Sequence, residues 1–363
     1  MSARSIGAEM TRKLSMLAYV AAVAAALPAA RTLPCADGEA SAATIVMPLK
    51  LVAGQPATLA VLTAEGKLAP GVAVEFSGGQ RVTTDDSGRA LFTAPDETGV
   101  LLVEVPDSDA SASATVIAAG PPAGVQLLQM PRVISLRDRF SVGGRGFRGE
   151  ADANQVRLGG QPGVVLAASP ASLVILPSPQ AALGVTQVAV NVGGAESSTV
   201  TTLVALEMTS EKPSLAPRQR ADLDLRVRGT DQPLELEARN LSPTVVHFVH
   251  GDAQRVMTRG GQENSAAIQM EGVSPGEFSF SVRIVPPPAG QPDVGAAREY
   301  LLAARKVATP KQARRVDKLI QKLDQRSQDV VKIRNDLEKM MAAKPPGQYG
   351  RLIEAAWEVL LNR

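Results

Sequence analysis

The order of apolar and polar residues in the central part of the chain predicts β-structure. Between residues 139 and 192, apolar runs of three to five residues are separated by Gly, Pro and Asn. In the segment 187–192 (QVAVNV), valine alternates strictly with a polar or small residue, which is the period of a half-buried strand. Many short strands at this spacing predict a β-sandwich.

Two flanking regions repeat this pattern. Strands are expected at 46–52, 57–62 and 71–76 before the central region, and at 223–227, 234–238, 245–249 and 278–285 after it. Pro- and Gly-rich linkers occupy 118–124 and 286–292. The sequence therefore predicts three β-units, at 41–119, 121–207 and 209–286.

Beyond the second linker, in the region 295–363, the apolar period changes to that of a helix. A first helix is expected around Tyr300, and Thr309 followed by Pro310 is a good start for a second. That second helix is expected to continue to about residue 343, because apolar residues fill heptad a and d positions over four heptads, with Arg326 as an interruption. The apolar stripe is wide, which is more typical of packing against neighbours than of a free coiled coil. The segment 345–347 (PPG) ends the pattern, and a last amphipathic helix is expected up to Leu360, so that the helices form a hairpin or small bundle.

Residues 1–30 have the pattern of a secretory signal peptide. Arg12 and Lys13 precede a 14-residue apolar segment, which is short for a membrane span, and small residues follow it. Cleavage is expected after Ala30 or after Gly38, and a retained anchor helix is the alternative. Cys35 invites a lipidation hypothesis, but Leu-Pro directly before this cysteine fits the lipid-attachment pattern badly. The pattern predicts an extracytoplasmic location: periplasmic, cell-surface or secreted.

Two segments carry resemblances to known families. The motifs GGRGF (143–147), NQVRLGG (154–160) and VTQVAVNVGGAESS (185–198) resemble an IPT/TIG domain over about 121–207, although MPRVIS (130–135) replaces the usual Pro-rich opening. The segment TDDSGRALFTAP (84–95) resembles bacterial Ig-like domains over about 41–119. Both resemblances imply an immunoglobulin-like fold and a cell-surface setting, and neither implies a reaction. The expected fold class is mainly β and multidomain: tandem Ig-like β-sandwiches followed by a C-terminal α-helical hairpin or small bundle.

The composition offers few of the residue types that catalytic and metal sites commonly use. The chain has one cysteine, two histidines and only 3% aromatic residues. Thiolate metal sites, His-rich metal centres and His-based triads are therefore not expected. No G-x-S-x-G, H-E-x-x-H or P-loop motif is present, although a hydrolase with a carboxylate pair stays open because its two residues need share no local motif. No catalytic, cofactor-binding or metal-binding residue is predicted, and the chain is expected not to be an enzyme.

Three local patterns have a site-like interpretation and a plainer one. The glycines at 144, 146 and 149 satisfy G-x-G-x-x-G, but a strand-like run follows them instead of a helix, so a turn is favoured over a nucleotide site. Asp85 and Asp86 supply only two carboxylates, which favours a turn over a calcium site. His247 and His250 lie three residues apart, so a strand would place them on opposite faces.

The charge is unevenly distributed. From residue 295 to the end there are 15 Lys and Arg against 8 Asp and Glu, a net charge of +7, and the rest of the chain carries −5. Basic helices of this kind could meet an anionic surface, or simply be solvated. The sequence thus predicts a non-catalytic envelope or secreted protein without a nucleic-acid partner. Its Ig-like domains would serve as spacers or bind a protein or envelope polymer, and its basic helices would mediate assembly or docking. The alternative is a carbohydrate-binding accessory protein of an extracellular polysaccharide system, for which the few aromatic residues are a poor supply of stacking platforms.

Overall fold

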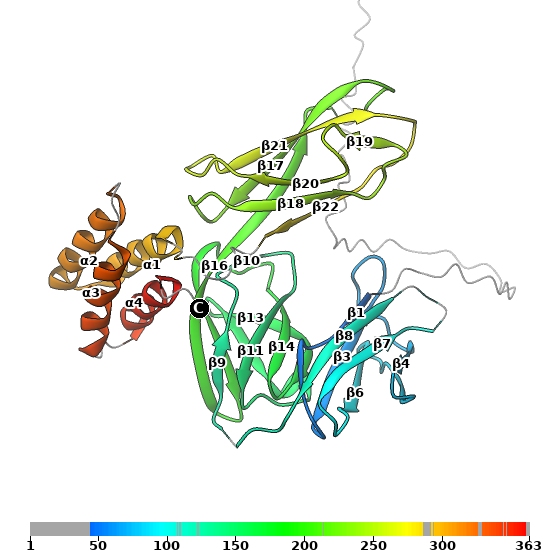
Figure 1. The fold of residues 1–363 in the computed structure, drawn as a ribbon, viewed down its shortest axis with the longest axis horizontal. Helices are drawn as coiled ribbons and strands as arrows, with labels where there is room; N and C mark the ends of the chain where they lie inside the picture. The colour runs from blue at the N-terminus through cyan, green and yellow to red at the C-terminus, as the bar shows by residue number, and fades with distance from the viewer. Residues whose placement is uncertain are drawn as a thin grey trace, which may run out of the picture.

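The computed structural model describes residues 44–285 apart from 107, 109, 122 and 213, and then 292, 294–325, 329–343, 345 and 347–360. This part of the chain forms three β-sandwiches followed by four α-helices (Figure 1). The expected fold class, tandem Ig-like sandwiches followed by C-terminal helices, is therefore confirmed. The predicted signal peptide and Cys35 lie outside the described residues.

The first sandwich has two sheets, in the strand orders β1-β3-β6 and β2-β8-β7-β4-β5. The single strand expected at 46–52 is wrong, because Pro48 has no N–H and the chain there leaves one sheet for the other. β1 pairs antiparallel with β3, and β2 pairs parallel with β8. The core between the sheets includes the ring pair Phe76–Phe92, with centroids 4.7 Å apart. The strands are β1 (Thr44–Val46), β2 (Lys50–Val52), β3 (Pro56–Leu62), β4 (Ala73–Phe76), β5 (Arg81–Thr83), β6 (Arg89–Thr93), β7 (Gly99–Glu104) and β8 (Ser111–Ile117).

The second sandwich repeats this arrangement. Its first strand is also split, near Pro131: β9 pairs antiparallel with β11, and β10 pairs parallel with β16. The alternating segment 187–192 lies in β15, where Val188 and Val190 are fully buried, as predicted. The elements are β9 (Gln126–Gln129), β10 (Val133–Ser135), β11 (Phe140–Arg145), the 3-10 helix η1 (Ala151–Ala153), β12 (Gln155–Leu158), β13 (Gln161–Ser169), β14 (Ser172–Leu176), β15 (Gly184–Val192) and β16 (Ala195–Ser210).

The third sandwich shares a strand with the second. The first half of β16 pairs with β15, and its second half, from Ala205, pairs with β17. The sequence boundary expected at 207–209 thus falls inside a continuous strand. The two sheets have the orders β16-β17-β21-β19 and β20-β18-β22. The strands are β17 (Arg220–Arg228), β18 (Glu235–Asn240), β19 (Val246–Phe248), β20 (Ala253–Met257), β21 (Ser265–Gly272) and β22 (Phe280–Ile284).

The helices are α1 (Val294–Val307), α2 (Pro310–Leu323), α3 (Val330–Ala342) and α4 (Gly347–Leu360). Thr309 caps α2 through a capping box with Gln312, as the Thr-Pro pair predicts. The single helix expected up to residue 343 is wrong: α2 ends at Leu323, and Asp329 caps the start of α3 by accepting a hydrogen bond from the Lys332 N–H (3.0 Å).

The heptad residues on both sides of this break lie in one shared core. Val316, Leu319, Leu323, Ile333 and Leu337 are buried together with residues of α1 and α4, so the helices form a bundle and not a coiled coil of four heptads. None of the helices in the described ranges is long and apolar enough to cross a membrane.

Candidate functional site

The first and second sandwiches pack side by side. β3 meets β13 at Thr58 and Ala168 in a short antiparallel pairing. A separate apolar cluster fills the space between the two units, made of Val46, Ala60, Leu62, Leu166, Ala167 and Val174. Burial of these side chains fixes one sandwich against the other.

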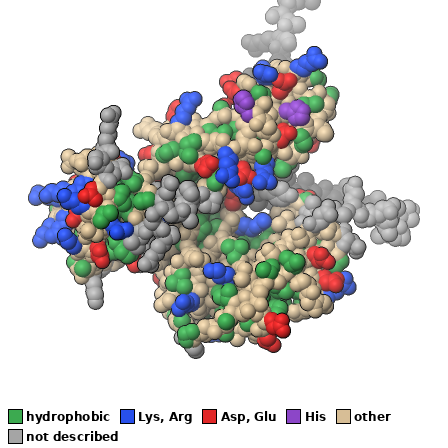
Figure 2. Space-filling model, in the orientation of Figure 1, with side chains coloured by type: hydrophobic (Ala, Val, Ile, Leu, Met, Phe, Trp, Pro, Cys, Tyr) green, Lys and Arg blue, Asp and Glu red, His purple; other side chains and the backbone are tan. Residues whose placement is uncertain are grey.

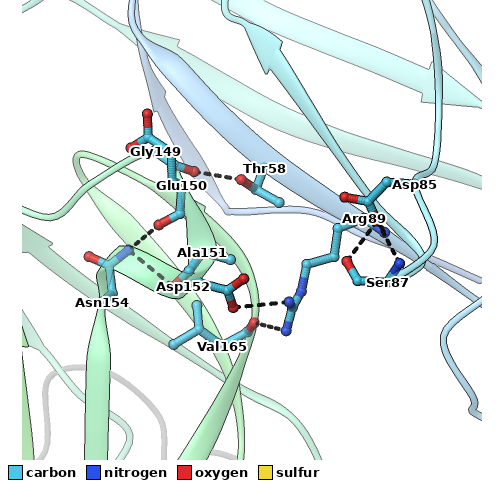
Figure 3. Close-up of polar contacts among 10 residues, drawn as sticks. All are labelled: Thr58, Asp85, Ser87, Arg89, Gly149, Glu150, Ala151, Asp152, Asn154 and Val165. Atoms are coloured by element: carbon cyan, nitrogen blue, oxygen red, sulfur yellow. Dashed lines mark hydrogen bonds and ion pairs between the residues drawn. The ribbon is translucent and has the colours of Figure 1, made fainter.

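Arg89, the first residue of β6, joins the two sandwiches directly after the turn at Asp85 (Figure 3). The Asp85 carboxylate accepts hydrogen bonds from the backbone N–H groups of Ser87 (2.8 Å) and Arg89 (3.1 Å), which closes the turn. The Arg89 guanidinium donates to the Val165 carbonyl (2.8 Å) and to Asp152 (3.1 Å) of the second sandwich. The turn predicted at Asp85 is thus confirmed, and no group of three or more potential metal ligands exists among the described residues.

The same turn perturbs the ionisation of Asp85. The hydrogen bond from the Ser87 side chain (2.7 Å), with that from the Arg89 backbone N–H, holds the pKa of Asp85 below its ordinary value. The carboxylate is therefore committed to the turn as an acceptor.

The G-x-G-x-x-G segment lies at this junction as well. β11 ends at Arg145, Gly146 has a φ of +72°, and a 3-10 helix and a strand follow, so the turn interpretation is confirmed. Gly149 contacts the first sandwich: its carbonyl accepts a hydrogen bond from the Thr58 hydroxyl (2.7 Å), and a Cβ there would lie 2.1 Å from the Pro56 carbonyl oxygen. The glycine is needed for close approach of two backbones.

A cleft of about 880 Å³ lies where the three sandwiches meet. Figure 2 shows Lys and Arg side chains along the hollow between the third sandwich and the other two. The walls combine aliphatic side chains with arginines from two of the sandwiches. The residues that define this junction cleft are Leu49, Leu62 and Leu68 of the first sandwich, Ile134, Arg137, Arg139, Phe140, Val164 and Leu166 of the second, and Arg283 and Ile284 of the third.

Cations outnumber acids in the junction cleft. Arg137 and Arg139 are exposed and have no ion pair with a described acid, and Asp138 lies between them. The Asp138 side chain is accessible from the cleft, but the surrounding walls desolvate it and raise its pKa, against the effect of Ser135 and Arg139. The cleft is therefore suited to a ligand that is partly apolar and partly anionic.

Arg283 belongs to a charge network on the outer face of the third sandwich. It donates to both carboxylate oxygens of Glu237 (3.0 and 2.9 Å), and Arg239 donates to the same carboxylate (2.7 Å). Hydrogen bonds from Arg283, and then from Arg239, lower the pKa of Glu237 to about 2. Arg255 stands 3.6 Å away, so three arginines surround one carboxylate and the network stays cationic.

A second cationic surface lies on α2. Lys311, Arg314, Arg315 and Lys318 are exposed, and their spacing places them on one face of the helix. Acidic residues nearby are bound to other cations: Asp317 to Arg305 (2.5 Å) and Asp336 to Lys322 (2.6 Å). Within the described ranges, the four residues of this basic face have no ion pair with a carboxylate, and blue side chains cover this end of the molecule in Figure 2.

The helical bundle is attached to both neighbouring sandwiches through α1. Glu299 accepts hydrogen bonds from the hydroxyls of Thr202 (3.3 Å) on β16 and Thr230 after β17. Burial raises the pKa of Glu299 above its ordinary value, and these two hydrogen bonds oppose the shift. The basic face on α2 is therefore presented by a bundle that is fixed to the sandwiches.

The two histidines do not converge. His247 lies on β19, exposed, with Nδ1 3.7 Å from an Asp252 carboxylate oxygen, and His250 lies in the following turn. Aromatic side chains are equally unavailable: every Phe, Tyr and Trp within the described ranges is buried or partly buried. These ranges therefore offer no exposed aromatic platform for a sugar ring.

Sequence reasoning missed the residues that build the junction. The contacts that matter there join residues far apart in the sequence: Thr58 with Gly149, and Arg89 with Val165. No local sequence pattern reports such pairs. The basic face was detectable from the charge excess after residue 295, and its spacing on α2 could be read from the helical period.

Comparisons with known proteins give only distant resemblances. No family model and no curated protein matches the chain. Among solved structures, the SGBP-B protein of the Bacteroides ovatus mixed-linkage glucan utilization locus, in complex with a mixed-linkage heptasaccharide, has a TM-score of 0.26 and 11% identity and covers 65% of this chain and 70% of its own. The I9–I11 tandem of titin (TM-score 0.18, 9% identity, 67% and 94% coverage) and invasin, a bacterial integrin-binding protein (0.18, 18%, 67% and 56%), are similar in the same distant way. At these scores no ligand or partner is carried over.

Proposed function

We propose that this chain is a non-catalytic, extracytoplasmic binding protein, in which a rigid arm of Ig-like sandwiches is docked on an anionic envelope surface by its helical bundle. The second sandwich would be of the IPT/TIG type. The observation that carries the proposal is the basic face on α2, where four exposed cations have no acidic partner among the described residues. The signal-like segment at 1–30 supports the location.

The chemistry of the basic face favours peripheral attachment. Each Lys or Arg near an anionic membrane contributes about 1 kcal/mol, so four acting together would give useful affinity without insertion. The apolar side of α2, with Val316, Leu319 and Leu323, is buried in the bundle and cannot enter a bilayer while the bundle is intact. Attachment would therefore weaken steeply as salt is added.

Vesicle sedimentation tests the docking. The full-length protein is expected to bind vesicles of phosphatidylcholine with phosphatidylglycerol, and not vesicles of phosphatidylcholine alone. Replacing Lys311, Arg314, Arg315 and Lys318 by Gln should weaken binding by at least about tenfold. A matched control replaces four exposed cations of the sandwiches, Lys67, Arg157, Arg226 and Arg259, by Gln; equal loss in both variants would contradict a specific basic face.

Fractionation with mass spectrometry of the mature N-terminus tests the location. A form that begins after Ala30 or Gly38 outside the cytoplasm is expected. An uncleaved cytoplasmic form would overturn the proposal, whereas lipid on Cys35 would keep it and add a membrane anchor. The carbohydrate-binding alternative is less well supported, because the described aromatic side chains are buried or partly buried.

A further inference from the structure

Within the part of the chain that the structure describes, the third sandwich lacks a strand that the first two possess. In the first, β8 pairs with β7, and in the second, β16 pairs with β15, so the last strand covers the edge of the strand before it. The third sandwich ends with β22, the outermost strand of the order β20-β18-β22. Within the described ranges, nothing pairs with the other edge of β22.

The backbone of β22 presents hydrogen-bonding groups to that open edge. The Val285 N–H donates to the Glu235 carbonyl (2.8 Å), and the Leu241 N–H donates to the Ser279 carbonyl (3.0 Å). In an antiparallel pair these bonds alternate along the strand, so odd-numbered residues from 279 to 285 bond to β18. The N–H and C=O groups of Phe280, Val282 and Ile284 consequently point outwards, as in an unprotected edge strand.

Side-chain burial shows the same gap. The core-facing residues Leu101 and Val103 of β7 are 4% and 1% exposed, and Val188 and Val190 of β15 are fully buried. On β22 the corresponding Val282 and Ile284 are only partly buried, although they pack on the core of the third sandwich. An additional strand would complete their burial.

This open edge borders the junction cleft. Ile284 and Arg283 line the cleft opposite Arg137 and Arg139. A strand laid along β22 would place alternate side chains over Val282 and Ile284, and the intervening ones on the outer face beside Arg283. Acidic residues at the intervening positions would match the cationic charge there.

We propose that β22 is an acceptor site for an extended segment of a partner protein, which supplies the missing last strand of the third sandwich. The segment alternates apolar residues, which complete the core, with acidic residues, which meet the arginines of the cleft. Main-chain hydrogen bonds provide affinity and the alternate side chains provide selectivity, as in other cases of strand addition. This site is distinct from the basic face on α2, so failure of vesicle binding would leave it unaffected.

Amide hydrogen exchange of the full-length protein, followed residue by residue by NMR, tests the open edge. Without a ligand, the amides of Val282 and Ile284 are expected to exchange quickly, while those of Ser281 and Arg283 are protected. Protection of Val282 and Ile284 that grows with protein concentration would overturn the proposal in favour of a second copy of the chain. Protection independent of concentration would overturn it in favour of an edge already covered by the chain itself.

A synthetic peptide probe tests the ligand class. A seven-residue peptide that alternates Val with Glu is expected to protect the Val282 and Ile284 amides. A peptide of the same composition with its Val residues contiguous should not, and a version with Lys in place of Glu should bind at least about tenfold more weakly, the factor that 1.4 kcal/mol represents. Equal binding of the three peptides, or binding without protection of these amides, would overturn the proposal.

Two variants at one position separate backbone pairing from side-chain packing. Val282→Pro removes an outward N–H without touching the bonds to β18, a position where an edge strand tolerates proline. It should abolish peptide binding, whereas Val282→Thr keeps the N–H and should bind to within a few-fold of wild type. Peptide binding that survives in a folded Val282→Pro protein would refute strand addition, and if that variant does not fold, the three-peptide comparison on the wild type decides.

Discussion

Arg89 holds two sandwiches together with one planar side chain. Its guanidinium satisfies a buried carbonyl, that of Val165, and an acidic side chain, that of Asp152, while the turn at Asp85 fixes its backbone. The side chain is 13% exposed, so water cannot readily replace these partners. The motif that resembles bacterial Ig-like domains therefore has a structural task at the junction.

Replacing Arg89 by Met tests this task. Met keeps an apolar stem of similar length but leaves the Val165 carbonyl without its donor, which should lower the free energy of unfolding by about 1–3 kcal/mol. Arg81→Met is the control: Arg81 and Glu75 form an exposed pair, so a change within about 0.5 kcal/mol is expected. Chemical denaturation of both variants gives the comparison, and equal effects would show that Arg89 has no special role.

The lowered pKa of Glu237 predicts how the stability of the fold depends on pH, and in which direction. Hydrogen bonds from Arg283, and then from Arg239, lower its pKa from 4.5 to about 2, so these ion pairs stabilise the fold fully above pH 4.5 and lose their effect as the pH falls to about 2. Glu237→Gln should therefore be less stable than wild type at pH 7, and the difference should shrink between pH 4.5 and 2. Thermal melting over this range checks it; a difference that stays constant with pH would contradict the assignment.

At the scale of elements, the start of α2 is set by its cap. The Thr309 side chain accepts from the Gln312 N–H (3.5 Å), and the Gln312 side chain accepts from the Thr309 N–H (2.9 Å). Thr309→Ala should remove the first contact and destabilise the bundle by roughly 1 kcal/mol, while Thr309→Ser should retain most of it. Urea titration followed by the fluorescence of Trp357 in α4 reports on the bundle, and equal midpoints for Ala and Ser would contradict the cap.

Sequence patterns predicted the buried positions of helices and strands well. They did not predict the points at which a helix or strand is interrupted. Alternation found the strand at 187–192, and the Thr309-Pro310 pair found the start of a helix. The same periodicity missed the helix break before Val330, because the a and d residues on both sides face one core and so keep their pattern. It also missed the strand break at Pro48, since apolar residues continue when a chain passes from one sheet to the other. The open edge of β22 could not be predicted either, because it depends on which strands pair with β22 among the described residues, and no local pattern reports such pairing.

At the scale of the molecule, the three sandwiches are interlocked by direct contacts. The second and third sandwiches share β16, and the first and second share a backbone pairing and an apolar cluster. The junction cleft exists only because these relative positions are held. Its shape should therefore respond to changes at contacts far from its own walls.

Gly149→Ala tests this coupling. The added Cβ would meet the Pro56 carbonyl oxygen at 2.1 Å, which forces the first and second sandwiches apart. Small-angle scattering should show an expanded or more variable molecule, while circular dichroism should keep its β-signal. Gly193→Ala is the control, because this glycine lies in an exposed turn where a Cβ meets nothing within 4 Å. Expansion in both variants would argue against a specific separation of the two sandwiches by the Cβ at position 149.

Burial of Glu299 is expected to make the stability of the helical bundle's attachment depend on pH. Its pKa is raised by burial, so in the folded protein it binds a proton at a pH where the unfolded chain has released one. Stability from this residue is thus present at low pH and declines as the pH rises through the raised pKa, the opposite sign to Glu237. Glu299→Gln keeps an acceptor for the hydroxyls of Thr202 and Thr230 without a buried charge. The variant should therefore be more stable than wild type at neutral pH, and its advantage should disappear as the pH falls towards 4.5. Melting temperatures measured across this range decide the point, because a variant that is less stable than wild type at neutral pH and equal to it at low pH would mean that the charge itself holds the bundle against the sandwiches.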